Sequence, residues 1–202
     1  MSTKIEIYNG ALGKIGVERM TGLTDESKQR YSLDDQYEAA LYATFKSYGW
    51  RFATKRAQLA LDSTDPVFGF ENRFALPSDY IRTLEVWNGY GNDIVWEEEA
   101  GFILTDEDTF YIKYTFKETN EGKYTPLFVE ALQYQLASLV AIPLKNNRSL
   151  AVDMQNAFIN ALTKAQVQDA KGRSKRKTKQ ESSWLSSRTT PVNSFVNYIK
   201  VT

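Results

Sequence analysis

The sequence predicts a mixed α+β fold, in which helices from both ends of the chain form a bundle and a small antiparallel β-sheet is inserted between them. The 202 residues are 42% hydrophobic and 25% charged, a composition typical of one globular domain. Apolar residues recur every three or four positions near both ends of this domain, which indicates helices. Between residues 57 and 117 the period changes to two, which indicates strands.

The N-terminal part carries a clear helix start. Thr3 is suited to be an N-cap, and Glu6 three residues later completes a capping box. A second helix is predicted from about residue 25 to 48. We expect Trp50 and Phe52, which follow it, to fill the core.

The central part reads as short strands. Segment 81–87 alternates, and the Asn88-Gly89 pair after it is a strong signal for a type I′ hairpin turn. A return strand at 94–96 would pair with it. Segment 109–117 is the clearest strand, with four apolar residues on one face: Phe110, Ile112, Tyr114 and Phe116.

Helices return at Thr125-Pro126, an N-cap followed by a proline at the first helical position. Pro143 is expected to end this helix because proline removes a backbone donor. Asn147 is expected to cap the last helix, and Gly172 to end it. The predicted organisation is a helical bundle domain (1–56 and 120–172), an inserted β-rich domain (57–119) and an extended C-terminal docking arm (173–202).

Composition excludes several classes of enzyme. The chain has no His and no Cys, so it has no Ser-His-Asp triad, no thiol nucleophile and no disulfide. Glu97, Glu98 and Glu99, like 106–108, are expected in exposed turns, which suits neither a glycosidase carboxylate pair nor a calcium loop. We therefore expect no enzymatic activity, no cofactor and no metal.

Charge is balanced overall but unevenly distributed. The 25 basic and 25 acidic residues cancel, so no net field favours nucleic acid or membrane. Residues 93–108 hold seven acids and no base, whereas residues 171–181 hold six bases and one acid. Such a chain can present differently charged surfaces to different neighbours.

Several stretches, in order, resemble the tail tubular protein A family, the head-to-tail adaptors of short-tailed bacteriophages. They are ALGKIG at 11–16, LTDESK at 23–28, YGWRFATKRAQLAL at 48–61, and TFYIKYT followed by PLFVEALQYQLASLVAIPL. FALPSDYIRTLEV at 74–86 resembles the family's Leu-Pro-x-Asp-x-x-Arg signature at Leu76, Pro77, Asp79 and Arg82. The resemblance extends from Thr3 to about Ala170.

The resemblance implies a non-enzymatic structural protein of a phage virion, assembled in the host cytoplasm. In such families twelve copies form a connector ring on the portal protein, and a tail nozzle or the next tail ring docks below. Genomic DNA passes through the central channel without sequence-specific binding, and no membrane is involved.

Three sets of residues are candidates for contacts in such an assembly. Portal docking is expected from the C-terminal arm, whose apolar residues are too few to form a core of their own: Arg173, Lys175, Arg176, Lys177, Trp184, Leu185, Arg188, Phe195 and Tyr198. Asp79 and Arg82 are candidates for a subunit contact, although Arg82 could instead pair with Asp79. Tail-facing acidic loops are expected at Glu97, Glu98, Glu99, Asp106, Glu107 and Asp108.

Two other functions remain open. A nucleic-acid-binding accessory protein could use the basic segment 171–179 on phosphates, and salt-dependent DNA binding by the isolated protein would favour it. A carboxylate hydrolase would show turnover on a polysaccharide that is lost on mutating Glu97 to Glu99.

Overall fold

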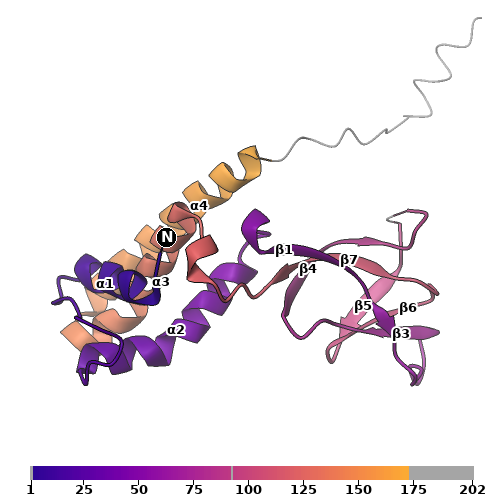
Figure 1. Ribbon diagram of the computed structural model, residues 1–202, viewed down its shortest axis with the longest axis horizontal. Helices are drawn as coiled ribbons and strands as arrows, with labels where there is room; N and C mark the ends of the chain where they lie inside the picture. Colours follow the sequence, from indigo (N-terminus) through magenta and orange to yellow (C-terminus); the bar gives the residue numbers. More distant parts are fainter. Residues whose placement is uncertain (1, 92, 173–202) are drawn as a thin grey trace, which may run out of the picture. The chain divides into compact units, whose positions relative to one another are not determined.

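Helices from both ends of the chain enclose the β-strands in sequence, which confirms the predicted α+β class. The computed structural model describes residues 2–91 and 93–172 (Figure 1). Helices α1 (Lys4–Lys14) and α2 (Lys28–Lys46) precede the strands, and α3 (Pro126–Lys145) and α4 (Arg148–Lys171) follow them. Helix α3 contacts all three other helices and is the centre of the bundle. The predicted arm 173–202 lies outside the described residues.

Local side-chain contacts determine where the first two helices begin. Thr3 and Glu6 form the predicted capping box, with the Thr3 N–H donating to the Glu6 carboxylate at 2.9 Å. Helix α2 begins three residues later than predicted, after the N-cap Ser27. The reason is that the Asp25 carboxylate accepts hydrogen bonds from the N–H groups of Thr21 and Gly22, which stabilises a turn there.

The C-terminal helices start as predicted, but α3 continues past Pro143. Its N-cap is Thr125 with proline at the first position, although the Thr125 side chain makes no capping hydrogen bond. Pro143 lies in the last turn, where it removes only one helical hydrogen bond, and α3 ends two residues later. Asn146 then adopts a left-handed conformation with φ 50°, and the Asn147 side chain accepts from the Leu150 N–H at 3.0 Å to start α4.

The strands form two antiparallel sheets rather than the single sheet expected. One sheet has the order β1-β7-β4 and the other β2-β3-β6-β5. The strands are β1 (Thr54–Gln58), β2 (Ala60–Leu61), β3 (Asn72–Ala75), β4 (Tyr80–Trp87), β5 (Trp96–Glu99), β6 (Phe102–Thr105) and β7 (Tyr111–Phe116). The four predicted apolar residues of the β7 region are buried as expected.

The predicted hairpin at Asn88-Gly89 is wrong. Strand β4 pairs with β7, while β5 pairs with β6 in the other sheet. A type I′ turn needs positive φ at both central residues, and here only Gly89 has it, at 99°. The Asn88 side chain instead accepts hydrogen bonds from the N–H groups of Tyr90 and Gly91, which makes a wider turn.

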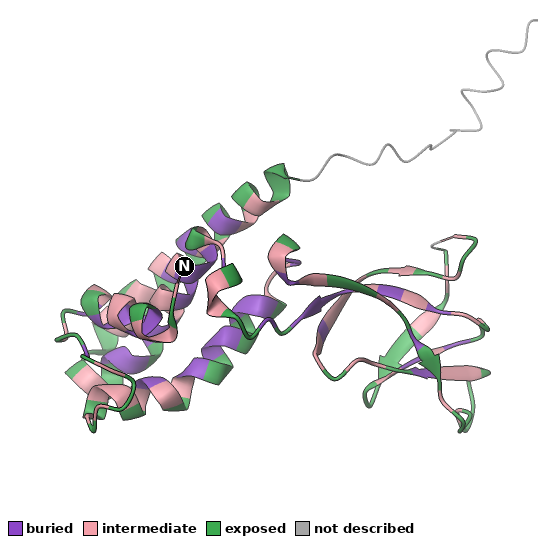
Figure 2. Ribbon diagram, viewed as in Figure 1, coloured by how far each residue is buried: buried purple, intermediate pink, exposed green. Residues whose placement is uncertain are grey.

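An aromatic cluster joins the helices to the start of the strands. Trp50 is completely buried, and its ring centroid lies 5.0 Å from that of Phe128 on α3. Phe45 on α2 and Phe52 also lie 5.0 Å from Phe128. The Trp50 indole N–H donates to the Thr44 carbonyl at 2.9 Å, so its one polar group is satisfied. Phe45 of α2 and Phe128 of α3 belong to the buried core, whose residues are purple in Figure 2.

Helix α3 is the one helix among the described residues that is long and apolar enough to cross a membrane. Half of its most apolar window is buried, and it contacts α1, α2 and α4. It is therefore the central helix of this bundle.

Candidate functional site

Asp79 lies in the connection before β4 and holds three strands together. Its carboxylate forms an ion pair with Lys55 of β1 at 2.6 Å and accepts a hydrogen bond from the Tyr114 hydroxyl of β7 at 3.0 Å. Its backbone carbonyl accepts from the Lys117 N–H. Partial burial raises the pKa of Asp79, but the hydrogen bonds from Lys55 and Tyr114 outweigh it, so the pKa is lowered. Burial and the bond to Asp79 raise the pKa of Tyr114 to about 12.

Arg82 has a different partner. Its guanidinium donates to the carbonyl of Lys46, the last residue of α2, at 3.0 Å. This bond satisfies one of the carbonyls left free at a helix C-terminus, and a positive charge there is favourable to the helix dipole. Arg82 therefore links a strand to a helix within one chain, and its role in a subunit contact stays a prediction.

The first acidic segment lies in a strand, not in a turn as predicted. Glu97, Glu98 and Glu99 belong to β5, an edge strand, and all three are exposed. The Glu98 carboxylate accepts a hydrogen bond of 2.5 Å from the hydroxyl of Tyr80 on β4. Burial and this bond raise the pKa of Tyr80 to about 12. Glu98 thus connects the two sheets.

The second acidic segment lies in the loop between β6 and β7, as expected. The Asp106 carboxylate accepts from the Glu71 N–H at 3.0 Å, and the Glu107 carbonyl accepts from the Asn72 amide at 3.2 Å. These bonds hold this loop to the start of β3. Asp108 is exposed. Among the described residues, no group of three acidic side chains is arranged to hold a metal ion.

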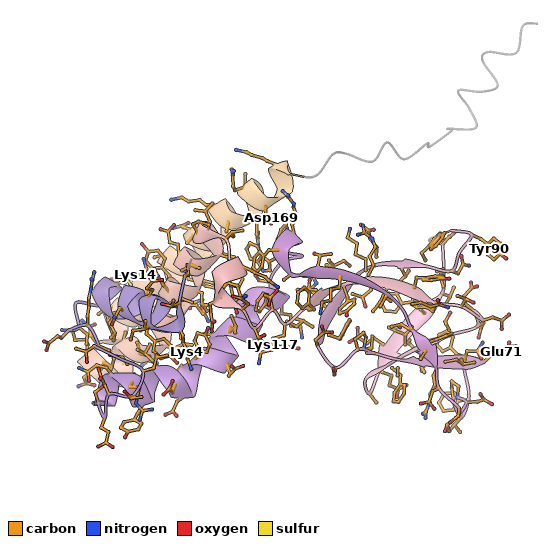
Figure 3. All side chains as sticks on the ribbon, viewed as in Figure 1. Lys4, Lys14, Glu71, Tyr90, Lys117 and Asp169 are labelled. Carbon is orange, nitrogen blue, oxygen red and sulfur yellow. The ribbon has the colours of Figure 1, made fainter. Side chains whose placement is uncertain are left out.

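Large apolar side chains project from two loops of the β-rich part. We call Val67, Phe68, Tyr90 and Val95 the loop-tip residues, and they are 97%, 87%, 98% and 77% exposed. The first two lie between β2 and β3, and the other two between β4 and β5. Tyr90 lies at the end of the β-rich part that is away from the helices (Figure 3). Exposed apolar side chains of this size are candidates for contact with a partner.

The sequence reasoning did not identify the loop-tip residues, although a signal was present. Each pair lies in a segment rich in turn formers, STDPVFGF and NGYGNDIV, where apolar side chains have no regular face to bury them. The sequence analysis assigns apolar contact residues to the C-terminal arm, and the structure adds exposed apolar residues in these two loops.

A hollow of about 430 Å³ lies where η1 (Arg51–Ala53) meets the end of α4. The Asp169 carboxylate accepts hydrogen bonds from the Arg51 backbone N–H at 3.2 and 3.3 Å, so it joins α4 to η1. The hollow is lined by Arg51, Phe52, Thr125, Ala165, Gln168 and Asp169.

The remaining predicted residues, the portal-docking set from Arg173 to Tyr198, lie outside the described residues. No family model matches the chain, and no curated protein matches it.

Proposed function

We propose that this protein is a structural head-to-tail adaptor of a phage virion, which joins the portal to the tail and surrounds the DNA channel. In this proposal several copies, twelve by resemblance, form a ring on the portal protein. The C-terminal arm docks on the portal, and the loops of the β-rich part face the tail nozzle or the next tail ring.

The observation that carries the proposal is the exposure of the loop-tip residues. An aromatic side chain that becomes buried against a partner removes about 150–250 Å² from water, at roughly 25 cal/mol per Å². Association and side-chain ordering offset part of this gain, so Phe68 and Tyr90 each offer roughly 1.5–3 kcal/mol to a contact that the isolated chain does not make. Aromatic side chains such as these are common anchors of protein–protein contacts, which supports a role in assembly.

The contacts of the signature residues support the resemblance. Asp79 holds β1 and β7 at the start of β4, and Arg82 binds the end of α2. Asp79 stabilises the sheet, and Arg82, three residues later, ties the same strand to a helix. A chain that joins a sheet to a helical bundle therefore has a physical use for both residues at this spacing.

The proposal is tested by electron microscopy of the protein mixed with purified portal protein from the same phage. We expect a ring of added density on one face of the portal. Removing residues 173–202 should abolish the ring while leaving the melting temperature of the body nearly unchanged. Particles without added density at saturating protein would contradict the proposal.

The two ends of the adaptor can be distinguished by variants of the loop tips. We expect Phe68→Ser with Tyr90→Ser to leave portal binding intact and to weaken nozzle binding by about 2 kcal/mol or more, because anchoring aromatic residues dominate such contacts. Tyr42→Ser, at a 46% exposed position on α2, is the matched control and should bind the nozzle as the wild type does. Equal nozzle binding by the loop-tip variant would show that these loops do not face the tail.

A further inference from the structure

Helix α4 presents an uncharged face to solvent along most of its length. One side of α4 packs on α3, where Phe158 and Ala161 are buried. The opposite side carries seven residues that we call the α4 seam: Ser149, Val152, Asn156, Ile159, Thr163, Gln166 and Ala170. Six of them are exposed, and Gln166 is half-buried.

The spacing of the α4 seam is that of a helix that pairs with another helix. Its residues follow each other at steps of three and four positions without interruption over three heptads. Val152 and Ile159 lie one heptad apart and are each about half-exposed. Apart from Arg148 at the first position of α4, the charged side chains of this helix lie outside the seam, as expected if the seam is covered by a partner rather than by water.

The charges beside the α4 seam identify that partner. Asp153 and Lys164 are eleven residues apart, so on a helix with 3.6 residues per turn they lie within about 20° of each other around the axis and about 16 Å apart along it. They thus occupy the same flank of the seam but are too far apart to pair within one helix. Neither takes part in the ion pairs found among the described residues.

An antiparallel pair of α4 helices brings these charges together. A two-fold axis perpendicular to the helices places the same flank of both copies side by side, so Asp153 of each copy faces Lys164 of the other. The midpoint between the two positions falls next to Ile159, so the two Ile159 side chains meet at the axis. A parallel pair would place the flanks on opposite sides, where neither ion pair can form.

We propose that a second copy of this chain docks on the α4 seam, with the two α4 helices antiparallel, so that the free protein dimerises. The inference is independent of the proposed adaptor function, because it concerns the protein without portal or tail. One helix on each side is a small interface, so the dissociation constant should lie in the micromolar range or above.

The first test is sedimentation of the full chain over a concentration series at low salt. The expected result is a rise from the mass of one chain, 23.1 kDa, toward twice that value. Ile159→Lys places two like charges at the axis and should give a monomer at every concentration. Leu23→Lys, which adds the same charge at an exposed position before α2, should still dimerise. Circular dichroism melts show whether both variants remain folded.

The second test exchanges the charges on the flank. Asp153→Lys alone and Lys164→Asp alone should each weaken dimerisation by about tenfold or more, since two attractive pairs become repulsive. An equimolar mixture of the two single variants should form heterodimers, and the double variant should dimerise like the wild type. A monomeric wild type, a dimeric Ile159→Lys, or a mixture that fails to restore association would overturn the proposal.

Discussion

Asp79 shows how one carboxylate can contribute to stability over a defined range of pH. Its pKa in the folded chain is lowered because the bonds from Lys55 and Tyr114 outweigh partial burial. The unfolded chain therefore binds more protons in acid, so this contribution is complete above the unfolded pKa of about 3.9 and is lost as the pH falls through the folded pKa.

We predict that Asp79→Asn lowers the free energy of unfolding at pH 7 by about 1 kcal/mol. The difference from the wild type should shrink as the pH falls below about 4, because the wild-type carboxyl then becomes neutral as well. Urea unfolding from pH 7 to pH 3 measures this. Asp65→Asn, in an exposed loop, is the control and should leave stability at pH 7 within about 0.5 kcal/mol of the wild type. A constant difference at every pH would contradict the role assigned to the Asp79 charge.

At the scale of the element, helix α4 depends on its N-cap residue, Asn147. Asn147 accepts from the Leu150 N–H at 3.0 Å and so satisfies one of the free donors of the first turn. We predict that Asn147→Ala costs about 1 kcal/mol of stability. Asn160→Ala, at an exposed position inside α4, removes the same side chain and should be neutral or slightly stabilising, because alanine has the higher helix propensity. Thermal unfolding of both variants measures the two changes in stability. Equal losses of stability would rule out a capping role for Asn147.

At the scale of the whole molecule, the aromatic cluster at Trp50 connects the helices with the strands. Trp50→Ala leaves a large cavity against Phe128 and removes the indole hydrogen bond to the Thr44 carbonyl, which keeps the bond from the Ser47 hydroxyl. We predict a loss of about 3–5 kcal/mol and one cooperative transition at a lower temperature. Trp87→Ala, at a 46% exposed tryptophan of β4, should cost about 1 kcal/mol or less. Calorimetry of both variants is the measurement, and similar losses would mean that the Trp50 cluster is not a special connection.

The sequence by itself determined the helices of this protein and much of its core. The capping box at Thr3 and Glu6 and the cap at Asn147 were predictable because their contacts span only three residues. The burial of Trp50 followed from its position between two regular apolar patterns. All the residues that make such contacts lie close together in the sequence, so a local pattern is enough to predict them.

Only the tertiary structure decided which strands pair and what the acidic residues contact. Strand β4 pairs with β7 across about 30 residues of chain, and the Asn88-Gly89 turn signal favoured a nearer partner that the core does not permit. Glu98 was expected in a free loop, yet it accepts from Tyr80 because the two sheets bring β4 and β5 together. Exposure of Phe68 and Tyr90 likewise depends on how the loops leave the strands. Contacts between residues far apart in sequence depend on the packing of the whole chain, and no local pattern encodes that.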